Sequence, residues 1–262
     1  MSGISGNFGD LRTRVISAIV MAVVGIADIW LGGAWFLALL VVVGGAMMWE
    51  LSRMLGAAPM AALMMGALAS VVMVAVPMLP AWGWLLLAVP PLVASALVAR
   101  DRVLCAVYGS AALLATFALY GFRLEQGLVW LIWLILVVVA SDVAGYFAGR
   151  TLGGPKFWPA VSPKKTWSGT VAGWVGAALV GLGFAAATQA GVGLALISAL
   201  VAFAAQMGDI AESAIKRRAG VKDSSNLIPG HGGVLDRFDA LLGASLVMLV
   251  SAALIGLPEV RL

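Results

Sequence analysis

The chain has 262 residues, of which 63% are hydrophobic and 11% are charged, and its formal net charge is +4. Soluble domains have about 45–50% apolar and about 25% charged residues, and here the apolar excess extends over the whole length. A soluble domain is therefore excluded, and so is one with a single anchor, and the composition predicts an all-α polytopic integral membrane protein. The single cysteine, Cys105, excludes an internal disulfide and a CxxC metal site.

Nine apolar stretches are long enough to cross a hydrocarbon core of about 30 Å. They lie at residues 14–32, 34–52, 60–78, 82–99, 103–120, 127–149, 169–189, 193–215 and 237–256. Residues 1–13 are polar, and we expect them to form a loose or interfacial arm. Prolines near residues 77–80 and 90–91 leave room for broken helices, so the expected number of spans is about nine within a range of eight to ten.

Lysine and arginine residues divide unequally between the two sides of this topology. Fourteen of the 16 lie in the N-terminal arm and the even-numbered loops: Arg12, Arg14, Arg53, Arg100, Arg102, Arg150, Lys156, Lys164, Lys165, Lys216, Arg217, Arg218, Lys222 and Arg237. Only Arg123 and Arg261 lie on the opposite side. The positive-inside rule then places the N-terminus and both long polar loops, 150–168 and 216–236, in the cytoplasm, which also explains the basic charge without nucleic acid.

The first polar group in the apolar pattern lies at residues 141–168. Ser141 and Asp142 come late in the sixth span, and Lys164, Lys165 and Thr166 precede the seventh. Lysines and hydroxyl groups directly before a helix suit the binding of an anion. The alternative is a basic membrane-surface patch that attracts anionic lipid, and the two interpretations agree if the substrate is itself an anionic lipid.

The second polar group lies at the end of the eighth span. In a helix, Asp209, Glu212, Ser213 and Lys216 share one face, and Gln206 extends it one turn deeper. A carboxylate inside a span is costly unless it is paired, hydrated or bound to a cation, so this face favours a functional site. The alternative is a ladder of side chains that only caps or pairs the end of the helix.

The third polar group runs through a glycine-rich turn, Pro-Gly-His-Gly-Gly at 229–233, into the ninth span. Glycines allow backbone amides to point at a phosphate. Asp236 and Asp239 begin the next helix, where an acid can also serve only the helix dipole, and Asp236 is the stronger candidate for a site. His231 is equally compatible with a hydrogen bond inside the loop.

Acids that can hold a divalent cation and basic residues that can hold phosphates thus gather at one membrane face. Magnesium commonly binds through one or two carboxylates plus substrate phosphates, so the pattern predicts phosphoryl or nucleotidyl transfer to a lipid. The chain has no GxxxxGK[ST] loop and no HExxH motif, which argues against a P-loop nucleotide site and a zinc protease.

The 27-residue run Ser213-x-x-Lys216-Arg217-x4-Lys222-Asp223 … Pro229-Gly-His231-Gly-Gly233-x-x-Asp236-Arg237-x-Asp239 closely resembles the signature of the phosphatidate cytidylyltransferases. Two further segments resemble that family: Gln206-x-Gly208-Asp209 with Glu212-Ser213, and Ser141-Asp142 … Tyr146-x-x-Gly149-Arg150 followed by Ser162-Pro163-Lys164-Lys165-Thr166. The resemblance covers about the C-terminal half. One position departs, because Ser168 precedes Gly169 where the family usually has a glutamate, so a carboxylate role there is in doubt.

The resemblance implies transfer of the cytidylyl group of CTP to phosphatidate, giving CDP-diacylglycerol and pyrophosphate in phospholipid biosynthesis. It implies catalytic roles for Asp209, Ser213, Lys216 and Asp236, with Asp209 and Asp236 as ligands of Mg2+. Substrate-binding roles are implied for Asp142, Lys164, Lys165, Thr166, Arg217, Lys222, His231, Arg237 and Asp239. A second, monovalent cation and a homodimer are compatible with the family.

The same reading divides the chain into scaffold helices at 1–126 and a catalytic membrane region at 127–262. It places the protein in the inner (plasma) membrane, in contact with membrane lipid, with the active site facing the cytoplasm. No nucleic-acid partner is expected.

Three other functions remain open at this point. A related CTP-dependent membrane enzyme would use a polyprenol or an ether lipid as acceptor. A transporter would place its charges near the bilayer midplane at broken helices, whereas these charges gather at one face. A purely structural scaffold explains the apolar half and leaves the acids, lysines and glycines unexplained. A CDP-alcohol phosphotransferase is not indicated, because its DG-x2-AR run is absent.

Overall fold

The computed structural model describes residues 5–255, and side chains are described for residues 11–251. Within these limits the chain forms nine α-helices, two 3-10 helices and one two-stranded hairpin. Helices are expected because hydrocarbon offers backbone N–H and C=O groups no partner outside their own segment. The chain divides into two compact units, one up to Leu113 together with Val221–Arg237, and one with Leu114–Gly220 and the chain from Phe238.

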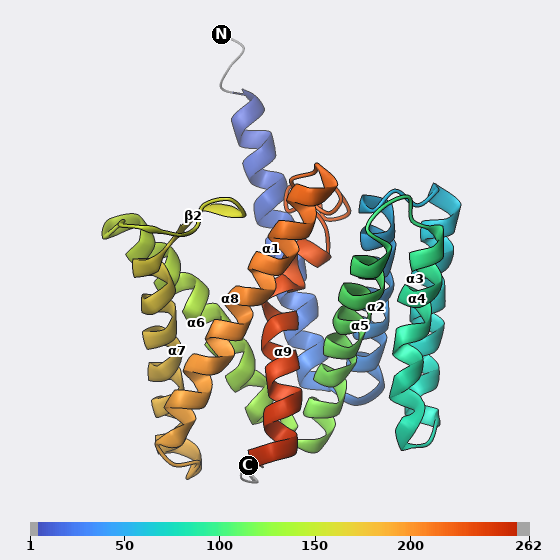
Figure 1. Cartoon of the computed structure of the whole chain (residues 1–262). Coiled ribbons are helices and arrows are strands. Elements are labelled where there is room, and N and C mark those ends of the chain that lie inside the picture. Colours follow the sequence, from blue (N-terminus) through green and yellow to red (C-terminus); the bar gives the residue numbers. More distant parts are fainter. Residues whose placement is uncertain (1–4, 256–262) are drawn as a thin grey trace. The chain divides into compact units, whose positions relative to one another are not determined.

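The first unit is built from the N-terminal helices (Figure 1). They are α1 (Ser5–Leu31), α2 (Gly33–Met54), α3 (Pro59–Ala75), η1 (Val76–Met78), η2 (Ala81–Ala88), α4 (Val89–Leu97) and the first part of α5 (Arg102–Glu125). Helix α2 packs against α3, and α3 packs against α4. Glycines permit the first of these contacts, since a Cβ atom on Gly66 would lie 2.8 Å from the carbonyl oxygen of Gly45.

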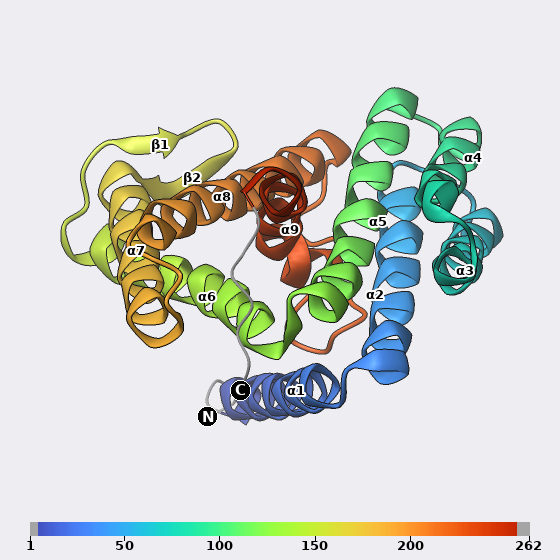
Figure 2. The same cartoon turned by 90° about the horizontal axis from the view of Figure 1, so that it is seen from below.

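The second unit is built from the later helices and the hairpin. It contains the rest of α5, α6 (Gly127–Thr151), β1 (Lys156–Trp158), β2 (Ser162–Thr166), α7 (Trp167–Thr188), α8 (Gly193–Ala219) and most of α9 (Leu235–Ile255). Helix α7 packs against both α6 and α8, as Figure 2 shows. The strands pair antiparallel, with Lys156 opposite Thr166 and Trp158 opposite Ser162. The hairpin joins α6 to α7 and also contacts α8, so it covers the end of this helix group.

The prediction of an all-α polytopic membrane protein is confirmed. Seven helices in the described part of the chain are long and apolar enough to cross a membrane: α1, α2, α3 with η1, α5, α6, α7 and α8. Helix α9 coincides with the predicted span at 237–256, except that residue 256 lies outside the described residues. Arg261 and residues 1–4 of the predicted arm also lie outside them.

Three local predictions need correction. The expected span at 82–99 is divided into η2 and the short helix α4, because Pro90 and Pro91 remove backbone donors at the start of α4. Residues 5–13, expected to form a loose or interfacial arm, are not loose but helical and extend α1, and an interfacial position stays a prediction. The hairpin at 156–166 was not predicted, because its strands have only three and five residues and the second, Ser-Pro-Lys-Lys-Thr, lacks the alternation of apolar and polar residues by which a strand is recognised.

Candidate active site

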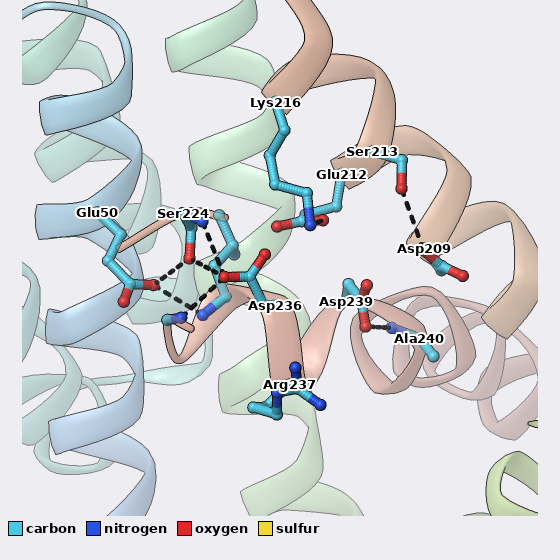
Figure 3. A network of polar contacts seen from close by, with 12 residues as sticks. Glu50, Asp209, Glu212, Ser213, Lys216, Ser224, Asp236, Arg237, Asp239 and Ala240 are labelled. Carbon is cyan, nitrogen blue, oxygen red and sulfur yellow. Dashed lines mark hydrogen bonds and ion pairs between the residues drawn. The ribbon is translucent and has the colours of Figure 1, made fainter. Parts of the chain in front are cut away.

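Helix α8 carries the polar face that the sequence predicts, at its C-terminal end. The Oγ atom of Ser213 donates to Oδ1 of Asp209, one turn earlier, at 3.3 Å. Lys216 forms an ion pair with Glu212, which is completely buried. Figure 3 shows these side chains along the helix. The spacing of three and four residues therefore produces the neighbouring pairs expected on one helical face.

Lys165 of β2 provides a cation for this face. Its Nζ atom lies 2.5 Å from Oδ2 of Asp209, and both side chains are partly buried, with 26% and 33% exposed. The same Nζ atom lies 3.4 Å from the backbone oxygen of Gln206. Neighbouring residues of a strand point to opposite faces, so Lys164 is exposed while Lys165 points to α8. The hairpin thus brings one lysine of the pair to the predicted catalytic aspartate.

Gln206, one turn deeper, connects α8 to the two helices beside it. Its Nε2 atom donates to Oγ of Ser141 on α6 and to the backbone oxygen of Thr170 on α7, both at 3.2 Å. Its Oε1 atom accepts from Nε1 of Trp174 at 2.9 Å. The side chain is buried. Its three hydrogen bonds hold α6, α7 and α8 together about one helical turn from the Lys165–Asp209 ion pair.

Two further carboxylates, from two other helices, interact with Asp209. Asp142 of α6 interacts electrostatically with both Asp209 and Lys165, and Asp239 of α9 interacts with Asp209, Lys216 and Asp142. Helices α8 and α9 approach closely here, because a Cβ atom on Gly208 would meet the backbone of Asp239 and Gly243. Four acids, Asp142, Asp209, Glu212 and Asp239, are thereby collected in the second unit with two lysines and one serine hydroxyl.

This donor set is chemically suited to a divalent cation. Magnesium prefers oxygen ligands and is usually held by one or two carboxylates, waters and substrate phosphates. Within residues 11–251, no group of three acidic, histidine or cysteine side chains is arranged to hold a metal ion by itself.

The glycine-rich part of the signature belongs to the first unit, where it forms a tight turn. The amide of Ile228 donates to the carbonyl of Gly232 at 2.8 Å, and the amide of His231 donates to the carbonyl of Ile228 at 2.9 Å. Gly230 and Gly232 have φ angles of 76° and 86°, which residues other than glycine rarely adopt. The ring of His231 also forms a hydrogen bond with α1, where Oγ of Ser17 lies 2.8 Å from its Nδ1 atom.

Asp236 holds this turn from the first turn of α9. Its Oδ2 atom accepts three hydrogen bonds of 2.8 Å, from the amide and hydroxyl of Ser224 and from the amide of Gly233. Arg237 donates from Nε and Nη2 to the carbonyl of His231, at 3.0 and 2.7 Å. The Gly233 amide, which the sequence suggested for a phosphate, is thus engaged by a carboxylate of the chain itself.

Glu50 of α2 is a member of this network that the sequence analysis missed. It is completely buried, and its carboxylate accepts hydrogen bonds from Ser225, Val234 and Leu235. It also lies beside the hydroxyl of Ser224, as Figure 3 shows. A signal existed, because Glu50 is the only acid in the apolar run 34–52, and an ionisable residue inside a span indicates function by default. Its partners lie some 175 residues away, so the sequence alone could not identify them.

The other predicted substrate-binding residues are distributed over both units. Lys164 and Arg217 are exposed in the second unit, and Lys222 is exposed in the first. Thr166 is buried as the N-cap of α7, where its Oγ1 atom accepts from the amide of Gly169 at 3.2 Å. Ser168 stands where the family usually has a glutamate. Its hydroxyl donates a hydrogen bond to the carbonyl of Gly153 and so connects the start of α7 to the loop after α6.

The structure thus collects Asp142, Lys165, Asp209, Ser213, Lys216 and Asp239 in the second unit, and His231, Asp236 and Arg237 in the first. Asp209 and Asp236, predicted to bind magnesium together, belong to different units, and their joint role stays a prediction. The division of function at residues 126 and 127 also stays a prediction. In the structure, residues 221–237 of the predicted catalytic region pack with the N-terminal helices.

The helices and the acid-and-lysine face of α8 define a polytopic membrane protein with a polar site suited to phosphates. Residues 12–255 match the cytidylyltransferase family, and the chain belongs to this family. The phosphatidate cytidylyltransferase of Brucella suis biovar 1 (strain 1330) is 34% identical over 280 residues, which cover 96% of each chain. Those of Helicobacter pylori (strain J99 / ATCC 700824) and Bacillus subtilis (strain 168) are 45% and 40% identical over 136 and 121 residues, covering 51% and 45% of each chain.

Proposed function

We propose that this protein is a phosphatidate cytidylyltransferase, which transfers the cytidylyl group of CTP to phosphatidate and releases pyrophosphate. The observation that carries the proposal is the family match over residues 12–255, together with relatives of that name aligned over 96% of the chain. The new bond joins a phosphate oxygen of phosphatidate to the α-phosphorus of CTP. The bond that breaks joins this phosphorus to the oxygen bridging it to the β-phosphate.

The acids and lysines of the second unit support this chemistry. The attacking phosphate is already an anion and needs no strong base, so the main tasks are to bring two polyanions together and to stabilise the leaving pyrophosphate. We expect Lys165 and Lys216, which pair with Asp209 and Glu212, and the exposed Arg217 to offset that charge. Ser213, bonded to Asp209, is suited to orient a phosphate oxygen.

Magnesium is part of the proposal, with Asp209 and Asp236 as its ligands. Bound magnesium would neutralise phosphate charge and polarise the reacting phosphate. Asp142 and Asp239 interact with Asp209 and supply further oxygen donors next to it. A second, monovalent cation is proposed only from the family resemblance.

The remaining proposals concern place and assembly. The positive-inside distribution supports an active site at the cytoplasmic face of the inner membrane. Lys164 and Lys156 are exposed on the hairpin, beside the exposed rings of Trp158 and Trp167, which suits contact with anionic lipid at a membrane surface. A homodimer is proposed from the family resemblance.

The proposal is tested by identifying the lipid product. The purified protein in detergent would receive CTP and Mg2+ with phosphatidate, an ether-linked analogue or polyprenyl phosphate, and the lipid extract would be analysed by mass spectrometry. We expect CDP-diacylglycerol from phosphatidate and much less cytidylylated product from the other two. A product formed only from polyprenyl phosphate or the ether lipid would contradict the proposed acceptor, and no product from any acceptor would contradict the reaction.

A further inference from the structure

Glu50 is a buried acid of α2 that the proposed reaction does not use. Its side chain has 0% exposure. Oε1 accepts from Oγ of Ser225 at 2.6 Å and from the amide of Val234 at 2.9 Å, and Oε2 accepts from the amide of Leu235 at 2.7 Å. Burying a carboxylate is costly unless its oxygens are hydrogen-bonded, and here both of them are.

The donors to Glu50 come from both ends of the glycine-rich turn. Ser225 precedes the turn, whereas Val234 and Leu235 follow it, at the start of α9. The first amides of a helix have no partner within the helix, and they carry the positive end of its dipole. One carboxylate from α2 thus satisfies the start of α9 and closes the turn at its base.

Ser224 connects Glu50 to Asp236. Its Oγ atom lies 3.2 Å from Oε2 of Glu50 and 2.8 Å from Oδ2 of Asp236. A hydroxyl group has one proton to donate, so the shorter distance indicates donation to Asp236. Gly233 lies against the same atoms, because a Cβ atom there would collide with Oγ of Ser224 and Oε1 of Glu50. Both carboxylates and the turn are therefore packed as one unit.

We propose that Glu50 is a positioning residue, which fixes the segment Val221–Arg237 and thereby the orientation of Asp236. The proposal rests on the proposed function only in giving Asp236 a role in the reaction. The positioning itself concerns the conformation of the segment, and it can be measured without any activity.

The test compares hydrogen–deuterium exchange of the segment with activity in Glu50 variants. Glu50→Gln keeps the shape of the side chain but turns one acceptor oxygen into a donor that faces other donors. We expect the amides of residues 223–235 to exchange at least about tenfold faster and kcat to fall at least about tenfold. Glu50→Asp keeps both acceptors on a shorter side chain and should recover part of both losses.

The matched control is Ser52→Ala in the same helix. Ser52 is also completely buried, but its hydroxyl bonds to the carbonyl of Met48 within α2. We expect exchange of the segment and kcat to stay within about twofold of the wild type, because the hydroxyl makes a local helix contact only. A role of Glu50 in packing alone predicts the opposite ranking, with Gln tolerated and Asp damaging.

Unchanged exchange of residues 223–235 in Glu50→Gln would overturn the proposal, whatever the activity. Peptides from α6 and α7 in the same sample report whether the protein is folded. If they also exchange faster, Ser225→Ala takes the place of Glu50→Gln, since it removes one donor and leaves the buried carboxylate. Its expected effect is about threefold faster exchange of the segment, and no change would overturn the proposal. If the wild type proves inactive, the exchange result still decides the role of Glu50.

Discussion

At the scale of single residues, the ion pair between Lys165 and Asp209 is the most informative contact of the second unit. The two atoms lie 2.5 Å apart and are only partly exposed, so solvent screens them less than it screens a surface pair. The pair keeps an acid and a cation together at the place where the proposed reaction would bring magnesium and phosphates. Lys164, the next residue, is exposed on the other face of the strand.

We predict that Lys165→Met lowers kcat by about 100-fold, because a charge aimed at the reacting phosphates is lost. Lys164→Met should mainly raise KM for lipid, since an exposed charge contributes to attraction of an anionic surface. Steady-state kinetics on mixed micelles at several phosphatidate fractions separates the two effects. Equal losses of kcat in both variants would show that the orientation of Lys165 toward Asp209 has no special role.

The residue scale also shows where prediction from the sequence stops. The helical spacing of Asp209, Ser213 and Lys216 was sufficient to place them on one face. The bond from Lys165 to Asp209 was not predicted, because it depends on the hairpin, which the sequence did not reveal. Glu50 was missed because its hydrogen-bond partners are distant in the chain.

At the scale of elements, α7 is held between α6 and α8 by small residues. A Cβ atom on Gly173 would lie 2.5 Å from Nε2 of Gln206 and 2.8 Å from Oγ of Ser141. At Gly183 of the same helix, such a Cβ would have no atom within 4 Å apart from the neighbouring backbone of its own helix. The two glycines of α7 are therefore suited to a comparison, because Gly173 lies where α7 contacts α6 and α8, whereas Gly183 has open space beside it.

We predict that Gly173→Ala destabilises the protein by about 1–3 kcal/mol, as overpacking of a close contact usually does. Gly183→Ala should be tolerated, because alanine fits a helix and meets nothing there. Thermal unfolding in detergent, followed by tryptophan fluorescence, measures both. A Gly173→Ala variant as stable as Gly183→Ala would mean that the crossing of α6, α7 and α8 is looser than described.

The elements were largely predictable from the sequence for a physical reason. A run of apolar residues long enough to cross a membrane has to be helical, so the spans could be placed by length and composition. Short elements follow weaker rules, which explains why η2, α4 and the hairpin were missed or merged. Helix ends in the polar regions were also less certain, as the extension of α1 back to Ser5 shows.

At the scale of the whole molecule, the distribution of basic residues predicts the orientation in the membrane. Hairpin lysines and the signature segment are expected in the cytoplasm, whereas the short connection between α5 and α6 is expected outside. Glu125 lies at that connection and is exposed, as Lys164 is in the hairpin. Cys105, the single cysteine, is buried and can be replaced to give a cysteine-free background.

We predict that Lys164→Cys in a Cys105→Ala background reacts with a membrane-impermeant maleimide only in inside-out vesicles. Glu125→Cys in the same background should react only in right-side-out vesicles. Labelling is read by a mass shift on gels, with detergent-opened vesicles as the measure of full reactivity. The reverse pattern would invert the topology and place the polar site on the outer face.

The most direct test of the central claim is magnesium-dependent release of pyrophosphate from CTP by the purified protein, with and without phosphatidate. The account predicts release that needs both the lipid and Mg2+, and a loss of at least about 100-fold in Asp209→Asn. Glu125→Gln, a change at an exposed acid in the connection between α5 and α6, on the side opposite to the predicted cytoplasmic loops, should match the wild type. Release that persists in a folded Asp209→Asn protein, or that does not depend on phosphatidate, would contradict the assignment of this reaction to the Asp209 face of α8.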